Sequence, residues 1–213
     1  KSIEDNDVLI SGYNKVSMDE HKLLFTSIPK DCIWTEFKYV STCAKMYSLD
    51  FLKANNIKYA PLKIGEDVYF NLSMNSIKII PYAGYNYCLN QNSVTQNHNT
   101  LNKDNKILDL LNRIYNDLAL NEKYSNKMIQ YFYLKTVVLF LLMQVNVCDK
   151  KAYLKFCKEG FEFLKSMGYD SFSLVEEDEL KVKLCTTIYW LANKLHLNGL
   201  LYSLLRPLHL QIG

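Results

Sequence analysis

The spacing of apolar residues changes near residue 97, and this change divides the chain of 213 residues into two parts of different structural class. Before it, short apolar runs alternate with Gly, Pro and Asn, which is typical of strands and short helices joined by turns. After it, apolar residues recur three or four positions apart, which predicts helices. We therefore expect an α/β domain over residues 1–97 and an all-α helical region over residues 98–213. The Asn-rich stretch of residues 90–105 is the expected linker between them.

The first part contains a short apolar run over residues 7–13 that ends at a glycine, as a buried strand does. Residues 14–38 are of mixed polarity and predict a hairpin or an irregular excursion. The other expected elements are helices over residues 45–55 and 66–74, an extended or loop segment over 57–64, and extended segments over 76–80 and 85–87, which Pro81 and Gly84 separate.

In the second part, helices are expected over residues 107–118 and 153–167, and Gly168 suits a helix C-cap. The capping-box pattern of residues 173–176 predicts a further helix that runs to about residue 195. The acidic run of residues 176–179 then complements the dipole of that helix instead of forming a metal cluster. The apolar run of residues 136–145 falls short of the ~20 residues that span a bilayer, so it predicts a buried helix.

The composition excludes several classes of protein. With 49% hydrophobic and 22% charged residues the chain is globular and not disordered. A net charge of +3 without a basic stripe argues against nucleic acid as a partner. Six cysteines without a Cys-x-x-Cys pair predict buried, reduced thiols in a cytoplasmic protein. The four histidines are too dispersed for zinc, and residues 5–7 predict a turn before a strand instead of a metal site.

Two adjacent carboxylates, Glu66 and Asp67, follow Gly65 at the start of an expected helix. The dipole of a helix favours the charged form of a carboxylate in its first turn. Such a group can act as a general base towards a hydroxyl, and Gly65 lets the backbone turn tightly and leave the site open. The same two acids could instead only stabilise the helix, so the pair alone leaves both alternatives open.

The segments on either side of this pair resemble the acceptor-binding half of bacterial family 2 glycosyltransferases of the GT-A type. The residues that carry the resemblance are Lys45-Met46-Tyr47, Asp50-Phe51-Leu52, Asn55-Asn56-Ile57, Glu66-Asp67, Phe70, Ile80, Tyr85, Tyr87, Asn92, Ser93 and Thr95. The resemblance covers nearly all of residues 1–97 and none of residues 98–213 with any specificity. The sequence departs from the family pattern just before the Lys-x-Tyr element. Many members have a Trp there, whereas this chain has Cys43 and Ala44.

The resemblance implies the C-terminal portion of an inverting glycosyltransferase. Such an enzyme transfers a sugar from a nucleotide-sugar donor to a hydroxyl of an acceptor. The donor is expected to be UDP-linked, and the acceptor is expected to be a cell-surface glycan or a glycolipid, that is, a glycan or a lipid-linked acceptor. Asp67 matches the catalytic base, and Glu66 matches an acidic neighbour that positions the acceptor. The nucleotide-binding half with its Asp-x-Asp motif is expected upstream of Lys1. The complete enzyme would therefore use a divalent metal, Mg or Mn, whose ligands are not in this chain.

Three further residues are candidates for substrate binding. Lys45 either contacts a phosphate or faces solvent. Tyr85 and Tyr87 project to the same side of an extended segment, so they either line a sugar pocket or belong to the core. His98 lies in the polar stretch and is expected to be solvated instead of binding metal.

Residues 180–213 contain Trp190, many leucines and no acid. The four Lys and Arg residues of this stretch are Lys181, Lys183, Lys194 and Arg206. A basic amphipathic stretch suits an anionic membrane surface, but it also suits a homo-oligomer interface or the core of the helical region. The expected location is cytoplasmic, either free or peripheral on the inner face of the plasma membrane. The alternative function is a non-catalytic helical interaction or assembly module derived from a glycosyltransferase.

Overall fold

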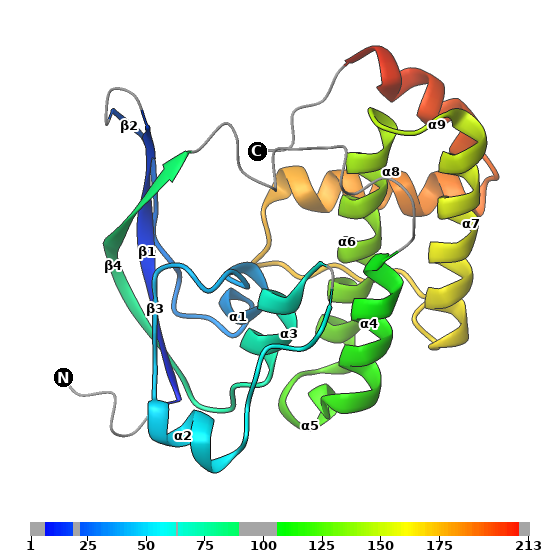
Figure 1. The fold of residues 1–213 in the computed structure, drawn as a ribbon. Coiled ribbons are helices and arrows are strands. Elements are labelled where there is room, and N and C mark those ends of the chain that lie inside the picture. Colours follow the sequence, from blue (N-terminus) through cyan, green and yellow to red (C-terminus); the bar gives the residue numbers. More distant parts are fainter. Residues whose placement is uncertain (1–6, 19–21, 63, 90–105, 209–213) are drawn as a thin grey trace. The chain divides into compact units, whose positions relative to one another are not determined.

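The computed structural model describes residues 7–18, 22–62, 64–89 and 106–208, which fall into two compact units, Lys1–Gln96 and Asn97–Gly213 (Figure 1). In its described residues, the first unit combines a four-stranded sheet with short helices, and the second is helical. The fold class expected from the sequence, an α/β part followed by helices, agrees with this architecture. The expected linker of residues 90–105, with Asn92, Ser93, Thr95 and His98, lies outside the described residues, as do Asp5 and Asn6.

The sheet of the first unit is built around β1 (Val8–Ser17), whose first three residues are buried. β2 (Leu23–Ser27) and β3 (Lys45–Tyr47) pair antiparallel with β1, and β4 (Ile77–Leu89) pairs with it in parallel along its whole length (Figure 1). A hairpin or an irregular excursion was expected for residues 14–38, and the structure has a hairpin of β1 and β2, which begins earlier, at Val8. β1 continues beyond Gly12, where the sequence predicts its end, because β2 and β4 supply backbone partners as far as Ser17.

β4 corrects the prediction of two extended segments. It is a single strand, and its register against β1 shifts where Ser11 pairs with Ile80 and Gly12 with Ala83. The shift places Pro81 and Tyr82 in a bulge, which lets the strand carry a proline without losing its pairing.

The expected helix of residues 45–55 is wrong in its first half. Lys45–Tyr47 pairs with Val8–Ile10 as β3, and the helix α2 (Leu49–Ala54) begins only after Ser48. The Ser48 side chain accepts a hydrogen bond from the backbone N–H of Phe51 at 3.2 Å, which is an N-cap interaction. Local periodicity missed this boundary because the partner of β3 lies far away in the sequence.

The core of the first unit lies between the sheet and α3 (Glu66–Leu72), which confirms the helix expected over residues 66–74. Phe70 and Met74 pack against Val8 and Ile10 of β1. Figure 1 shows α3 and α1 (Thr35–Lys38) on the same face of the sheet. This packing holds the first turn of α3, with its two carboxylates, beside the segment that precedes β3.

The second unit is organised around one buried helix. Its elements are α4 (Lys106–Asp117), α5 (Leu120–Lys123), α6 (Asn126–Val145), α7 (Lys150–Ser166), α8 (Leu180–Lys194), α9 (Asn198–Leu205) and the 3₁₀ turn η2 (Arg206–Leu208). α6 contacts α4, α5, α7 and α8. Among the described helices it alone has the length and apolarity of a membrane span, and 67% of its most apolar window is buried inside the protein.

The capping-box prediction is wrong about the start of α8. The helix begins at Leu180, after the acidic run, and not near residue 173. Asp178 is 5% exposed, and its carboxylate accepts a hydrogen bond from Tyr131 at 2.8 Å and lies 3.0 Å from the Lys135 ammonium. These contacts with α6 hold residues 173–179 outside the helix. Gly168 does end α7 as expected, with a φ of 72°.

The six cysteines are free thiols, but the prediction that they are buried is wrong for most of them. Only Cys157 is buried, Cys88 is exposed and the others are half-buried, because Cys32, Cys43 and Cys148 lie in turns or bends outside the helices and strands. Burial raises the pKa of the Cys157 thiol to about 12, so this residue stays in its unreactive thiol form at neutral pH.

Candidate functional site

The two adjacent carboxylates occupy the first turn of α3. Gly65, the N-cap residue, has a φ of 73° and a ψ of 18°, a left-handed conformation that strains any residue with a Cβ. The turn at Gly65 brings Glu66 and Asp67 into the helix directly after an irregular segment. Both side chains are half-buried, so they remain accessible from solvent.

The Asp67 carboxylate faces the segment of residues 39–43. Its Oδ2 atom accepts hydrogen bonds from the backbone N–H and the hydroxyl of Thr42, both at 3.4 Å. These are long bonds, so they orient the carboxylate without engaging it strongly. A carboxylate held in this way can still accept a proton from a hydroxyl that approaches it.

Asn71 fastens α3 to the same segment one turn further along. Its amide donates hydrogen bonds to the carbonyl of Val40 at 2.8 Å and to the carbonyl of Asp67 at 2.7 Å, and its side-chain oxygen accepts one from Tyr47 at 3.0 Å. Asn71 is 6% exposed, so these bonds are shielded from water. The position of Asp67 relative to residues 39–43 therefore depends on a buried amide.

Lys45 bonds to the same segment of residues 39–43 as Asp67 does, and its charge interacts with that of Asp67. Its ammonium donates hydrogen bonds to the carbonyls of Tyr39 and Ser41. Burial lowers the pKa of Lys45 to about 8, and the charge of Asp67 acts in the opposite direction. The structure thus brings together two of the residues that the sequence selects, Lys45 and Asp67, and directs the lysine inward.

A cavity of about 340 Å³ opens on the side of this segment that carries aromatic residues. We call it the tyrosine pocket, because Tyr13, Tyr39 and Tyr87 line it together with Lys15 and Lys38. The Tyr13 ring meets the rings of Tyr39 and Tyr87 edge-on, with centroids 6.4 Å and 6.2 Å apart. The three rings come from β1, β4 and the segment before β3, which the sheet brings together.

The tyrosine pocket and the Asp67 carboxylate share one wall. Ser41 and Cys43 line the pocket, and Thr42, which lies between them in the chain, contacts Asp67. Asp67 itself is not among the pocket-lining residues. A ligand in the pocket would therefore contact the two chain neighbours of the residue that hydrogen-bonds to Asp67.

The two tyrosines that the sequence selects on β4 both lie near the pocket and not in the core. Tyr87 lines it, and Tyr85 is 41% exposed. A hydrogen bond with the Cys43 thiol raises the pKa of Tyr85, but Tyr85 is not among the residues that line the pocket. Cys43, which directly precedes Ala44 and Lys45 in the chain, lies in the wall of the pocket.

Sequence reasoning missed most of this pocket. Tyr13, Tyr39, Lys15 and Lys38 gave no motif, because they lie on separate segments that only the sheet joins. The high tyrosine content, 16 residues, was the one signal available, and it does not point to particular positions. Within the described residues no group of three or more His, Cys, Asp and Glu is arranged to hold a metal ion.

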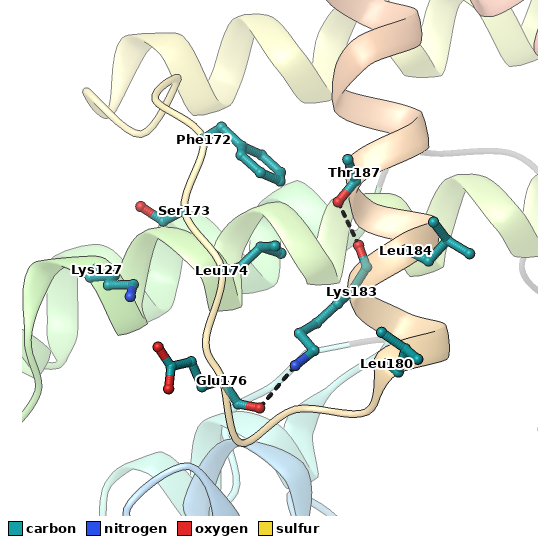
Figure 2. Close-up of a pocket in the computed structure, with 9 residues that line it drawn as sticks. All are labelled: Lys127, Phe172, Ser173, Leu174, Glu176, Leu180, Lys183, Leu184 and Thr187. Atoms are coloured by element: carbon teal, nitrogen blue, oxygen red, sulfur yellow. Dashed lines mark hydrogen bonds between the residues drawn. The ribbon is translucent and has the colours of Figure 1, made fainter.

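A second cavity of about 640 Å³ lies in the helical unit at the start of α8 (Figure 2). Its apolar lining consists of Phe172, Leu174, Leu180 and Leu184. The Lys183 ammonium donates a hydrogen bond to the backbone carbonyl of Glu176 at 2.9 Å, which closes one side of this groove (Figure 2). The groove is open and apolar, so it suits binding better than catalysis.

The same groove is the beginning of an exposed apolar stripe along α8. The α8 stripe consists of Leu180, Leu184, Ile188, Leu191 and Leu195, which are 78%, 60%, 44%, 44% and 63% exposed. The opposite face of α8 buries Thr186, Tyr189 and Ala192. The helix thus contributes to the core and also exposes a row of large aliphatic side chains, which marks an interaction surface.

Comparison of the whole chain with protein-family models, with curated proteins and with solved structures gave no match.

Proposed function

We propose that this chain is the acceptor-side portion of an inverting GT-A-type glycosyltransferase of family 2. It would transfer a sugar from a UDP-sugar to a hydroxyl of a cell-surface glycan or glycolipid. The observation that carries the proposal is the wall shared by Asp67 and the tyrosine pocket, with Thr42 on one side and Ser41 and Cys43 on the other. The motif resemblance of residues 45–95 supports the same assignment.

In this mechanism the acceptor hydroxyl gives its proton to the Asp67 carboxylate as its oxygen attacks the anomeric carbon of the donor. The bond from that carbon to the diphosphate oxygen breaks in the same step, and the nucleoside diphosphate leaves with the electron pair. Attack from the side opposite the leaving group inverts the anomeric configuration. A divalent metal would neutralise the diphosphate, and we assign its ligands to the nucleotide-binding half expected upstream.

The neighbours of Asp67 have separate roles in this proposal. Lys45 places a positive charge near the carboxylate of Asp67. Glu66 positions the acceptor, and Gly65 provides the turn that exposes both acids. Tyr87 contributes to the wall against which a sugar ring packs, and Tyr85, exposed two residues earlier on the same strand, offers a second ring outside the pocket.

The experiment that tests the proposal compares the native protein, expressed from its complete reading frame, with Asp67→Asn. UDP release is measured across a panel of UDP-sugars with Mn²⁺ and glycan acceptors. We expect turnover to fall at least a hundredfold in Asp67→Asn while UDP binding persists, since general bases contribute ~10²–10⁴-fold. Asp31→Asn, which alters an exposed carboxylate of the same unit, is the control and should keep native activity.

Equal turnover in the native protein and Asp67→Asn would remove Asp67 as the base. Absence of both turnover and UDP binding across the panel would favour the second candidate, a non-catalytic interaction module. The α8 stripe is the observation that favours this candidate. In the region from Leu180 to Gly213 the charges are cationic, so its partner would be an anionic membrane surface or, failing that, a second copy of the chain.

A further inference from the structure

We propose that Lys45 is a positioning residue, whose ammonium holds residues 39–43 in the shape that forms one side of the tyrosine pocket. We call these five residues the wall segment. The role assigned to Lys45 rests on the proposed function in one respect, because it treats the tyrosine pocket as the place where the acceptor lies. It replaces both alternatives that the sequence leaves for this lysine, a contact with a phosphate and a side chain in solvent.

Four of the five residues of the wall segment line the tyrosine pocket, namely Tyr39, Val40, Ser41 and Cys43. The fifth residue, Thr42, donates hydrogen bonds from its backbone N–H and its hydroxyl to the carboxylate of Asp67. One short stretch of chain therefore contributes to the pocket and also contacts the proposed base. A change in its shape would affect both.

The carbonyls of the wall segment depend on side chains from elsewhere. The segment belongs to neither a helix nor a strand, so regular secondary structure gives its carbonyls no partners. The Lys45 ammonium donates hydrogen bonds to the carbonyls of Tyr39 and Ser41. The Asn71 amide donates one at 2.8 Å to the carbonyl between them, that of Val40. Two side chains thus hold three consecutive carbonyls.

Lys45 connects the irregular wall segment to the sheet. Its own backbone is part of β3, where Lys45 pairs with Ile10 of β1. Burial lowers the pKa of Lys45 to about 8, so the side chain is still mostly charged at neutral pH. Hydrogen bonds from a charged donor are about twice as strong as those from a neutral one. The ammonium is therefore the stronger of the two side-chain anchors of the segment.

The same contacts leave little of Lys45 for a ligand. An ammonium group has three donors, and two hydrogen bonds of Lys45 go to backbone carbonyls. Lys45 is also not among the residues that line the tyrosine pocket. A diphosphate would have to compete with both carbonyls for the ammonium. We therefore expect Lys45 to affect binding of the acceptor and not binding of the nucleotide-sugar.

Reaction of Cys43 with N-ethylmaleimide tests the proposal without any sugar. Cys43 is a half-buried thiol of the wall segment, and Cys32 is a half-buried thiol of the same unit outside it. Peptide mass spectrometry of the protein expressed from its complete reading frame follows both thiols in one sample. In Lys45→Met, Cys43 should react about fivefold faster, because the segment opens locally, and Cys32 should stay within about twofold of its native rate. Loss of a nearby positive charge by itself slows a thiol, so a faster reaction reports access.

Three further variants assign the effect to the anchors of the wall segment. Lys45→Arg keeps a cation with several donors, so its Cys43 should react at a rate closer to the native protein than in Lys45→Met. Asn71→Ala frees the carbonyl of Val40 and should also accelerate Cys43. Lys53→Met, which makes the same change at an exposed position of α2, is the control and should leave both thiols at their native rates.

Enzyme kinetics separate the acceptor from the donor. They use the UDP-sugar and the glycan acceptor that give the highest turnover. Lys45→Met should raise the KM for the acceptor about fivefold and leave the KM for the UDP-sugar, and binding of UDP with Mn²⁺, within about twofold. Weaker binding of UDP together with an unchanged reaction of Cys43 would overturn the proposal and make Lys45 a phosphate ligand.

Two results of the labelling experiment would also overturn the proposal. One is a native rate of Cys43 in Lys45→Met, and the other is equal acceleration of Cys43 and Cys32, which indicates a general loss of structure. Neither result removes the proposed function, because UDP release that depends on Asp67 is measured separately. Conversely, selective acceleration of Cys43 without any transfer of sugar would support the role of Lys45 and contradict the transferase.

Discussion

Replacement of Gly12 by alanine should destabilise the first unit more than replacement of Gly84, the other glycine of its sheet. A Cβ at this position would lie 2.2 Å from the Ser27 carbonyl oxygen, 3.1 Å from the Ile28 Cα and 3.1 Å from the Pro29 Cδ. The closest of these atoms belongs to the backbone, so no rotation of a side chain relieves the clash. β1 and the end of β2, with the residues that follow it, must therefore separate by about 1 Å, against the packing of the sheet.

The expected cost is ~3 kcal/mol, the upper end of the 1–3 kcal/mol range for overpacking, because backbone atoms block two directions. Gly84→Ala is the matched control on the neighbouring strand. A Cβ there meets nothing closer than the Tyr82 ring at 3.6 Å, so we expect no loss of stability and a gain of up to ~0.5 kcal/mol from the higher strand propensity of alanine.

Urea denaturation followed by tryptophan fluorescence measures this difference. The chain has two tryptophans, Trp34 in the first unit and Trp190 in the second. In a Trp190→Phe background, the buried Trp34 reports on the first unit alone. A loss of less than ~1 kcal/mol in Gly12→Ala, or equal stability of the two alanine variants, would show that the segment after β2 yields freely and would refute the reasoning. Because Ser27 lines the tyrosine pocket, Gly12→Ala should also weaken binding of sugar probes.

Three further predictions concern charge and exposed surface. Burial lowers the pKa of Lys45 from 10.5 to about 8. Between pH 8 and pH 10.5 the unfolded chain therefore binds more protons than the folded protein. The difference in free energy of unfolding between the native protein and Lys45→Met should therefore rise as the pH increases from about 8 to 10.5. Urea titrations in which this difference does not change with pH would contradict the prediction. Asp178→Asn should destabilise the helical unit by ~3 kcal/mol, measured by thermal and urea unfolding, because the Lys135 ammonium loses its buried carboxylate. If the α8 stripe binds membranes, Leu195→Gln should reduce co-sedimentation with phosphatidylglycerol vesicles at least threefold, whereas Leu24→Gln on β2 should not. Equal binding to phosphatidylcholine vesicles would argue against the role of charge.

The elements predicted correctly from the sequence are those whose signals are local. α3 follows a glycine with a left-handed backbone and two acids in its first turn, and the helix forms where these signals place it. The end of α7 at Gly168 is local in the same way, because the cap needs only a residue that tolerates a positive φ.

The errors occur where a distant partner overrides a local signal. Lys45–Tyr47 has helical periodicity but forms β3, because β1 offers it backbone hydrogen bonds. The capping-box pattern at Ser173 is not used, because Asp178 is held by Tyr131 and Lys135, 47 and 43 positions away in the chain. Propensity is a weak preference, and tertiary contacts of this kind exceed it.

The sequence by itself determined which residues are candidates for chemistry: the acid pair after Gly65, the lysine of the Lys-x-Tyr element and the tyrosines near the end of β4. It also determined the change from mixed structure to helices, since both follow from residue type and spacing. Only the tertiary structure decided that Lys45 donates hydrogen bonds to the carbonyls of Tyr39 and Ser41, and that Tyr13, Tyr39 and Tyr87 line one cavity with two lysines. The physical reason is that β1 and β4 pair in parallel across more than sixty intervening residues, and no local pattern carries that information.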